Sequence, residues 1–509
     1  MQSSNAAIAN AVARCRERGV IIPTFAQLRD PSLIPQHVND RLRHVGLWDV
    51  DPVNLFRITW KNEPVERGGL FNQGNTIEFP PALTGVPARI IGLVGRHFPT
   101  GAHKVGAAFG CLVPRLVTGQ FDPTAHKAVW PSTGNYCRGG AYDCALLGCS
   151  AVAILPEEMS RERFDWLKSI GAEVIRTPGC ESNVKEIYDK CWEIRRTRPD
   201  CVIFNQFEEF GNAAWHYHVT GGMICELFDR MAESRCARAA ASDEATCRPG
   251  GEGKRSAQCR LAAFVSATGS AGTIAAGDNL KTCFPAAKIV AVEALQCPTL
   301  LQCGFGGHRI EGIGDKHVPW IHNVRNTDLV VAVDDEQCIS LMRLFNEDAG
   351  RAVLEKAGIS RETIERLPDI GISSICNLVA AIKTARYYEL DDRDVIFLPL
   401  TDSMELYGSR IDEYRRQRGA YTGDHATADF ARYLAGVTID HMRELTYYDR
   451  KTLHHFKYFT WVEQQQRSVD DLRRLWDPEF WTEQYAMVDE WDRAILEFNA
   501  QVGLERVSS

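Results

Sequence analysis

The chain has 509 residues, and its 45% hydrophobic and 24% charged residues exclude a disordered or collagen-like protein. Its 66 Asp and Glu outnumber 58 Lys and Arg, and the resulting formal net charge of -8 argues against a nucleic acid as partner. No apolar run reaches the roughly 18 residues of a membrane span. The N-terminus lacks an apolar signal core, so we expect a cytoplasmic protein, and its length suggests more than one domain.

The cysteines number 17, which is too sparse for a disulfide scaffold. No Cys-x-x-Cys pair occurs, so we expect no metal site. In a reducing compartment the thiols should be free, and most of them lie among apolar or small neighbours, where they would pack as small hydrophobic side chains. Cys137 and Cys303 lie in glycine-rich segments, and the Cys137 thiol could select the substrate if it faces a pocket.

Short apolar runs alternate with helical patterns from about residue 88 onward. The segment 88–94 predicts a strand, and 104–119 predicts a helix that ends at a glycine. The alternation continues through 127–135, 138–148, 149–156, 161–179, 183–197, 201–207, 261–277, 288–294, 327–345 and 394–403. Repeated β–α–β units of this kind predict an α/β fold with a mostly parallel sheet covered by helices.

Two segments interrupt this alternation. Residues 229–258 contain Pro, Gly and mixed charge without a strand pattern, and we interpret them as a surface insertion. Residues 411–509 are charged, aromatic and helical in spacing. We interpret this segment as an amphipathic helical extension that packs on the body of the protein or on a second subunit. The alternative is a ligand-binding module.

The first loop that points to chemistry holds Lys104, which follows a Pro-Thr-Gly turn and opens a helix of small residues. A lysine at a helix start works against the helix dipole, which raises the cost of its charge. A lysine with a depressed pKa is what a Schiff base needs. The alternative is an ordinary solvated lysine.

Three further polar loops follow predicted strands, where ligands collect in open α/β sheets. Residues 132–135 offer hydroxyls and N–H groups that suit a carboxylate, and 266–277 is a glycine-rich loop that suits a phosphate but fits neither a P-loop nor a dinucleotide fingerprint. Residues 401–403 form a late polar loop. Each alone could be a helix cap, but together the four loops supply what pyridoxal phosphate and an amino acid require.

In this order, the segments between about 85 and 410 resemble the tryptophan synthase β-like superfamily of fold-type-II pyridoxal-phosphate enzymes. The likeness is greatest to the cysteine synthase and cystathionine β-synthase family. The segments that carry it are PTGAHK, STGN, NQF, GSAGT, GHRIEGIG, GISS and DSMELY. The resemblance implies two open twisted sheet domains with helices on both faces, pyridoxal 5'-phosphate as cofactor, an amino-acid substrate and a homodimer.

The resemblance also implies roles for single residues. Lys104 would form the Schiff base with the cofactor, and Asn135 would contact its 3′ oxygen. The phosphate would be bound by His103, Gly269, Ser270, Ala271, Gly272 and Thr273. Ser403 would meet the pyridine nitrogen. The substrate carboxylate would be held by Ser132, Thr133, Gly134 and Gln206.

The implied domain organisation has four parts. Residues 1–114 would hold an N-terminal segment and part of a large cofactor domain, and 115–212 a small mobile substrate domain. The large domain would continue over 213–410, with the insertion at 229–258, and the helical extension would occupy 411–509.

The implied reaction is β-replacement on an activated serine-type amino acid through an aminoacrylate intermediate, with a thiol or sulfide as nucleophile. The alternative is β-elimination by a lyase, such as a cysteine desulfhydrase or a serine or threonine dehydratase, which gives a keto acid and ammonia. A different class would be a non-catalytic binding or regulatory protein on a decayed scaffold. Intact Lys104, Asn135 and Ser403 argue against decay.

Several positions depart from the family pattern. Ala271 replaces a glycine of the phosphate loop, and Tyr136 replaces a small residue, which would narrow or reshape the substrate pocket. Thr401 could take the role of Ser403, and Asp402 could face the pyridine nitrogen instead. The glutamate that activates indole in tryptophan synthase is absent, which counts against indole as substrate.

Overall fold

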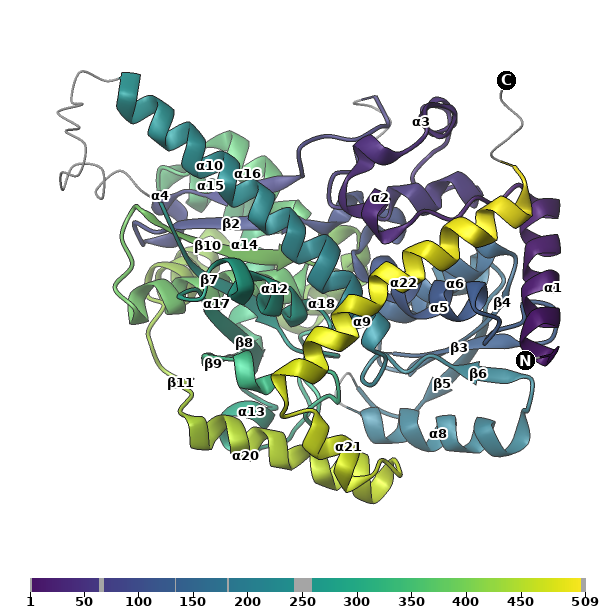
Figure 1. Cartoon of the computed structure of the whole chain (residues 1–509). Coiled ribbons are helices and arrows are strands. Elements are labelled where there is room, and N and C mark those ends of the chain that lie inside the picture. Colours follow the sequence, from purple (N-terminus) through teal and green to yellow (C-terminus); the bar gives the residue numbers. More distant parts are fainter. Residues whose placement is uncertain (1, 64–67, 133, 181–182, 242–258, 505–509) are drawn as a thin grey trace.

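The computed structural model describes residues 2–63, 68–132, 134–180, 183–241 and 259–504, and two sheets with packed helices form its centre (Figure 1). The larger sheet has seven strands in the order β1-β2-β10-β7-β8-β9-β11. They are β1 (Thr76–Phe79), β2 (Arg89–Val94), β10 (Asp394–Leu400), β7 (Arg260–Ala267), β8 (Lys288–Ala294), β9 (Leu329–Val333) and β11 (Met442–Glu444). Only the edge strands β1 and β11 pair antiparallel among these, so the predicted mostly parallel sheet is confirmed.

The smaller sheet has four parallel strands in the order β5-β4-β3-β6. They are β3 (Lys127–Pro131), β4 (Ser150–Pro156), β5 (Glu173–Thr177) and β6 (Cys201–Ile203). Successive side chains of a strand point to opposite faces of the sheet. Apolar residues on both faces of this sheet pack against helices. Val129 joins the apolar cluster under α8 (Val184–Thr197), whereas Trp130 joins the cluster that contains α6 (Asn135–Leu147).

The remaining α-helices surround these sheets. They are α1 (Gln2–Arg18), α2 (Phe25–Arg29), α3 (Gln36–Leu42), α4 (Pro81–Thr84), α5 (Lys104–Val117), α7 (Arg161–Ser169), α9 (Phe210–Trp215), α10 (Gly222–Ala241), α12 (Ala276–Cys283), α13 (Thr299–Gln302), α14 (Asp335–Asn346), α15 (Asp348–Lys356), α16 (Arg361–Arg366), α17 (Ile372–Tyr387), α18 (Gly408–Arg418), α19 (Gly423–Asp429), α20 (Tyr447–Lys457), α21 (Val469–Arg474) and α22 (Pro478–Val502). A π-helix, η6 (His216–Gly221), joins α9 to α10. The strand and helix predicted at 88–94 and 104–119 are confirmed as β2 and α5.

The central strands are buried from end to end, which explains why their sequence pattern is a continuous apolar run. Every residue of β9 and of β10 is buried. On one face Ile396 and Leu398 pack in the apolar cluster of α14 and α17, and on the other Val395 and Phe397 pack in the cluster of α5 and α12. Parallel strands covered by helices on both faces have this character.

The C-terminal extension packs on the body of the protein, which is one of the two placements expected for it. Helix α22 crosses α5 and α9, and its C-terminal end meets the C-terminal end of α1 (Figure 1). Its buried side chains include Trp481, Tyr485, Val488, Ile495 and Phe498. The extension also contributes β11 to the edge of the larger sheet, a strand that helical spacing did not predict.

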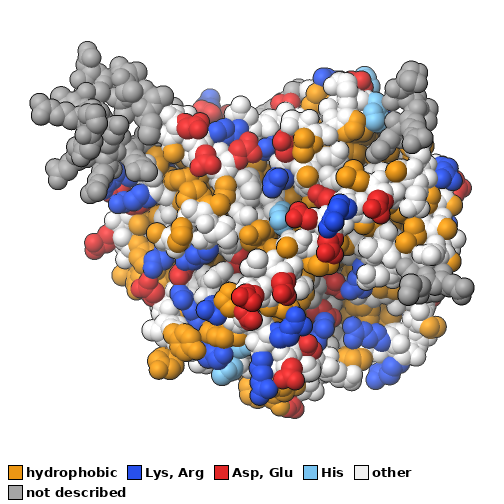
Figure 2. Space-filling model, in the orientation of Figure 1, with side chains coloured by type: hydrophobic (Ala, Val, Ile, Leu, Met, Phe, Trp, Pro, Cys, Tyr) orange, Lys and Arg blue, Asp and Glu red, His pale blue; other side chains and the backbone are white. Residues whose placement is uncertain are grey.

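The expected insertion at 229–258 coincides in part with α10, which ends at Ala241, and residues 242–258 lie outside the described part of the chain. In the described residues no helix is long and apolar enough to cross a membrane. On the face of the molecule seen in Figure 2, basic and acidic side chains are interspersed.

Candidate active site

The loops singled out in the sequence meet at the carboxyl ends of neighbouring strands. In the larger sheet β10 lies between β2 and β7, and all three run parallel. The loop after β2 leads to Lys104, the loop after β7 is the glycine-rich segment, and the loop after β10 holds residues 401–403. The first and the last touch directly, because the N–H of His103 donates to the carbonyl of Thr401 at 3.3 Å.

Lys104 begins α5 and is partly buried, so it is not an ordinary solvated lysine. Its Nζ donates to the hydroxyl of Ser270 at 3.2 Å, which ties the lysine to the glycine-rich loop. Burial lowers the pKa of Lys104 to about 8, against a smaller opposing effect of the Asp315 carboxylate. Burial also raises the pKa of Asp315 to about 8.

The glycine-rich loop turns sharply around Ala271, whose φ of 60° places an alanine in the left-handed region. That conformation costs a non-glycine residue about 1–2 kcal/mol, and such strain clusters at functional sites. Gly272 permits a close approach of α9, because a Cβ there would lie 1.9 Å from the Oδ1 of Asn212. Asn212 in turn donates to Ser270 at 3.1 Å and to the carbonyl of Gln206 at 3.0 Å.

A chain of buried hydrogen bonds runs beneath His103. Its Nε2 lies 3.2 Å from the hydroxyl of Thr273, which lies 3.4 Å from the Nε2 of His216. The Nδ1 of His216 lies 2.9 Å from the hydroxyl of Thr220, which accepts from the indole of Trp60 at 2.9 Å. Burial lowers the pKa of both histidines well below the ordinary value, so both rings are neutral.

The expected carboxylate loop lies at the end of β3, at the start of α6. The hydroxyl of Ser132 accepts from the N–H of Gly134 at 3.0 Å, and Thr133 lies outside the described residues. Gly134 has a φ of 152°, and a Cβ there would lie 1.7 Å from Nη1 of Arg163. Glycine is therefore required where the loop passes this guanidinium. Gln206 is buried beside Asn212.

Asn135 is connected to the loop after β10 through Asp402. The Oδ2 of Asp402 accepts from the Nδ2 of Asn135 at 2.6 Å and from the hydroxyl of Tyr407 at 2.8 Å. Its Oδ1 faces Gly371, since a Cβ on that glycine would lie 1.9 Å away. Burial raises the pKa of Asp402, while Arg163, Asn135 and Tyr407 oppose that shift.

Several residues at this edge escaped the sequence analysis. The Nε of Arg163 lies 3.1 Å from Glu311, and the other carboxylate oxygen of Glu311 accepts from Arg410 at 2.6 Å. Glu311 falls inside the GHRIEGIG segment, but its partners are far away in sequence and leave no local signal. Asp315 directly follows the same segment. This position next to a family segment is the only sequence feature that indicates Asp315 as a site residue.

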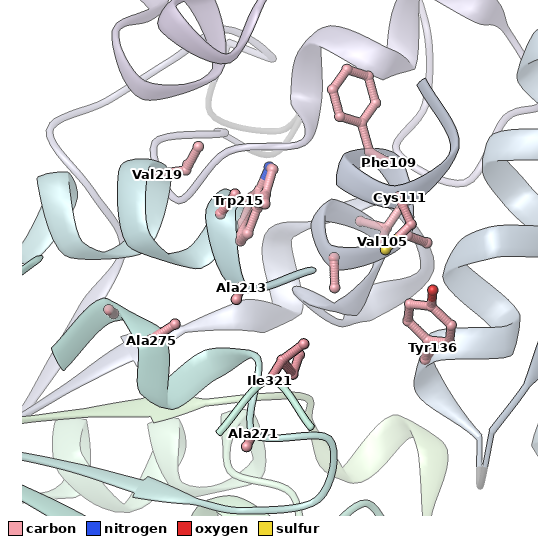
Figure 3. Packing of buried hydrophobic residues seen from close by; sticks show 14 of the residues in the cluster. Val105, Phe109, Cys111, Tyr136, Ala213, Trp215, Val219, Ala271, Ala275 and Ile321 are labelled. Carbon is pink, nitrogen blue, oxygen red and sulfur yellow. The ribbon is translucent and has the colours of Figure 1, made fainter. Parts of the chain in front are cut away.

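Tyr136 and Cys137 pack into the core. Tyr136 is 1% exposed and its ring meets Trp130 edge to face at 5.3 Å, and Figure 3 shows its side chain near Cys111 on α5. That Tyr136 narrows or reshapes the substrate pocket stays a prediction. The thiol of Cys137 is buried and donates to the carbonyl of Gly134 at 2.9 Å. Cys303 is exposed, and each cysteine whose side chain the structure describes is a free thiol.

A partly buried lysine, a glycine-rich loop and polar loops at parallel strand ends are an arrangement typical of cofactor-binding α/β enzymes. Residues 95–401 match the family described as "Pyridoxal-phosphate dependent enzyme", and the chain belongs to that family. It is 27% identical to a probable cysteine synthase of Bacillus subtilis, over 53% of this chain and 80% of that protein. It is 25% identical to the cystathionine beta-synthase of Mus musculus, over 57% of this chain and 45% of that protein.

Solved structures share the fold. A hydrogen sulfide-producing enzyme from Fusobacterium nucleatum superposes with a TM-score of 0.52 at 23% identity, covering 70% of this chain and 92% of that one. An O-acetylserine-dependent cystathionine beta-synthase from Helicobacter pylori superposes with a TM-score of 0.51 at 22% identity, covering 66% and 94%. The expected tryptophan synthase β-like fold is thus confirmed.

The residues at this edge fit the pyridoxal phosphate that the family implies. Among the described residues, the buried polar atoms without a hydrogen-bond partner include Nδ1 of His103, Oδ1 of Asn135, and the hydroxyls of Ser374 and Ser403 at this edge. Buried polar atoms without partners are costly, and native proteins contain few of them. A ligand with a phosphate, a ring nitrogen and a phenolic oxygen supplies the groups that these atoms lack.

Proposed function

We propose that the chain catalyses pyridoxal-phosphate-dependent β-replacement on an activated serine-type amino acid, with a thiol or sulfide as nucleophile. The observation that carries the proposal is the partly buried Lys104 amine, held 3.2 Å from Ser270 in the glycine-rich loop. The likeness to proteins named cysteine synthase, at 27% identity over more than half of the chain, supports this choice of reaction.

The proposed cofactor contacts follow the unpartnered atoms. Lys104 would bind the aldehyde carbon, and the ring nitrogen would meet the unpartnered hydroxyl of Ser403. The Oδ2 of Asp402 is engaged by Asn135 and Tyr407, whereas its Oδ1 has no hydrogen-bond partner among the described residues. Asn135 would contact the 3′ oxygen. The phosphate would be bound by His103, Gly269, Ser270, Ala271, Gly272 and Thr273, and the substrate carboxylate by Ser132, Thr133, Gly134 and Gln206.

Bound pyridoxal phosphate stabilises negative charge at the α-carbon of an amino acid and so permits loss of a β-substituent. The Lys104 amine is the proposed base that takes the α-proton. Its pKa of about 8 gives a useful share of uncharged amine near neutral pH, which an ordinary lysine lacks. The raised pKa of Asp315, about 8, keeps this neighbouring carboxyl largely protonated at pH 7, so it adds little charge beside the base.

We further propose that 115–212 is a small domain that closes over the substrate, between 1–114 and 213–410. Polar contacts support this, because α7 meets the segment after β10 through the carboxylate of Glu162, which accepts from the N–H and hydroxyl of Ser409 at 2.8 and 2.7 Å. Contacts of this kind can break and re-form during turnover. The homodimer is proposed on the family likeness, and light scattering would then give twice 57.0 kDa.

To test the proposal, the protein is first loaded with pyridoxal phosphate. It is then incubated separately with O-acetylserine, serine, cysteine and threonine, each in the presence and in the absence of sulfide. We expect cysteine from O-acetylserine and sulfide, and no product from Lys104→Ala. The exposed Lys168 provides the matched control, and Lys168→Ala should retain activity. Keto acid without thiol product would replace the proposal by β-elimination. A protein that neither binds the cofactor nor turns over any of these amino acids would be a non-catalytic scaffold.

A further inference from the structure

Arg138 is a buried cation beside the proposed substrate loop. It lies one helical turn after Asn135 in α6 and is 1% exposed. Its guanidinium stands over the ring of Trp166 at 4.7 Å and that of Trp48 at 5.8 Å. Among the described residues its Nε and Nη1 have no hydrogen-bond partner, and it forms no salt bridge there.

The acidic groups near Arg138 form hydrogen bonds with other residues, although the Oδ1 of Asp402 has no hydrogen-bond partner among the described residues. The carboxylate of Asp402 accepts from Asn135 and Tyr407, and that of Glu311 accepts from Arg410 and pairs with Arg163. Burial and the neighbouring charge of Arg163 lower the pKa of Arg138 to about 10, which still leaves it charged at neutral pH. A buried charge without a partner is strongly unfavourable, so this position calls for an anion.

Arg138 also lies between two loops of the proposed site. Its backbone N–H donates to the carbonyl of Gly134 at 3.1 Å, in the first turn of α6, at the end of the loop proposed for the substrate carboxylate. On its other side Trp48 covers Gly101, because a Cβ on that glycine would lie 3.1 Å from the indole. Gly101 precedes Lys104 in the PTGAHK segment. The backbone of Arg138 is thus anchored to the substrate loop, and its guanidinium lies against Trp48, which covers the lysine loop.

We propose that Arg138 binds a second anionic group on the substrate, so that the preferred substrates are amino acids with a carboxylate or phosphate on the side chain. This inference rests on the proposed function, since the 132–135 loop is assigned to the α-carboxylate. A guanidinium presents a planar fork of donors that matches either anion, and charge-assisted hydrogen bonds of this type are strong. The two indoles hold the fork in place by cation–π contact.

The test compares dissociation constants of L-serine, L-aspartate and O-phospho-L-serine for the holoenzyme, by calorimetry and by the change in cofactor absorbance. Aspartate and O-phosphoserine each carry a second anionic group. At least one of these two ligands should have a dissociation constant at least about tenfold lower than that of serine. The Arg138→Gln variant should abolish that preference and leave serine binding within about twofold, and Arg138→Lys should restore part of it. Aspartate and O-phosphoserine distinguish a carboxylate from a phosphate preference.

Arg325 is the matched control, because its guanidinium also stands over an indole, that of Trp476 at 5.7 Å, in the C-terminal extension. Arg325→Gln should leave all three dissociation constants unchanged. Arg138→Met should keep or raise the melting temperature, because it replaces an unpaired buried charge with an apolar side chain. A marked fall in melting temperature would instead indicate a structural role and count against the proposal.

The outcomes separate this inference from the proposed function. If serine binds but neither dianionic ligand binds more tightly, the proposal for Arg138 is wrong and the proposed function stands. If Arg138→Gln weakens serine and the dianionic ligands equally, Arg138 binds the α-carboxylate and the proposal is again overturned. If none of the three perturbs the holoenzyme, the proposed function fails, and the inference fails with it.

Discussion

The indole of Trp60 is the one group in the hydrogen-bond chain beneath His103 that can only donate. Thr220 accepts from it at 2.9 Å, and we expect Thr220 to donate its hydroxyl proton to the Nδ1 of His216. The neutral His216 would then carry its proton on Nε2 and donate it to the hydroxyl of Thr273. Thr273 would in turn donate to Nε2 of His103, which places the proton of His103 on Nδ1, the atom without a partner among the described residues.

Trp60→Phe should remove this directionality. We expect the imidazole ¹⁵N shifts of His103 and His216 to move from a single neutral tautomer toward a mixture. The free energy of unfolding should fall by about 1 kcal/mol for the lost hydrogen bond. Trp481→Phe is the control, because its indole donates at 2.9 Å to the carbonyl of Leu475, outside the chain. Unchanged histidine shifts in Trp60→Phe would show that the indole does not set the tautomers.

Local sequence signals located part of the candidate site. Lys104, Ser270 and Asn135 each follow a predicted strand. The structure places Lys104 beside Ser270 in the larger sheet, and Asn135, from the smaller sheet, beside Asp402. Arg138 and Trp60 were missed, because a single arginine in a helix or a single tryptophan in a loop carries no sign of what it will face. Their importance depends on contacts between residues far apart in sequence.

At the scale of elements, apolar periodicity predicted the central strands and missed the edges. Strands such as β9 and β10 are buried on both faces and therefore appear as unbroken apolar runs. The edge strand β11 has only three residues, all partly or fully exposed, and its pairing with β9 depends on tertiary placement. Periodicity cannot reveal a strand that buries no face of its own.

Helix α22 stabilises the N-terminal segment through a long-range cap. The carboxylate of Asp492 accepts from the N–H groups of Phe25 and Ala26 at 2.6 and 3.0 Å, at the start of α2. Farther along, the side-chain amide of Asn499 exchanges hydrogen bonds with the backbone of Ile22 at 2.8 and 3.1 Å. The extension is thus part of the folded body, which sequence spacing alone could not distinguish from a separate module.

Asp492→Ala should lower the free energy of unfolding by about 1–2 kcal/mol, because two N–H groups at a helix start lose their charged acceptor. Urea denaturation measures this change. Asp489→Ala on the same helix is the matched control, since that side chain is exposed, and its effect should stay below about 0.5 kcal/mol. Equal effects of the two substitutions would show that the cap contributes nothing specific.

At the scale of the whole molecule, the proposed site lies where elements of both sheets meet. Asn135 and Arg163 come from helices beside the smaller sheet, whereas Asp402 and Glu311 come from loops beside the larger one. The apolar pattern predicted a mostly parallel sheet, and the family resemblance implied two sheet domains and the order of the loops. The sequence could not predict these charge pairs, because they form only when two separately folded sheets come together.

The central claim is that Lys104 is the residue that binds pyridoxal phosphate. The most direct test treats the cofactor-loaded protein with borohydride and locates the resulting pyridoxyl group by peptide mass spectrometry. We predict a single modified peptide that carries the group on Lys104, and none in the Lys104→Ala protein. A pyridoxyl group on another lysine, or no modification of a protein that has been incubated with the cofactor, would contradict the account.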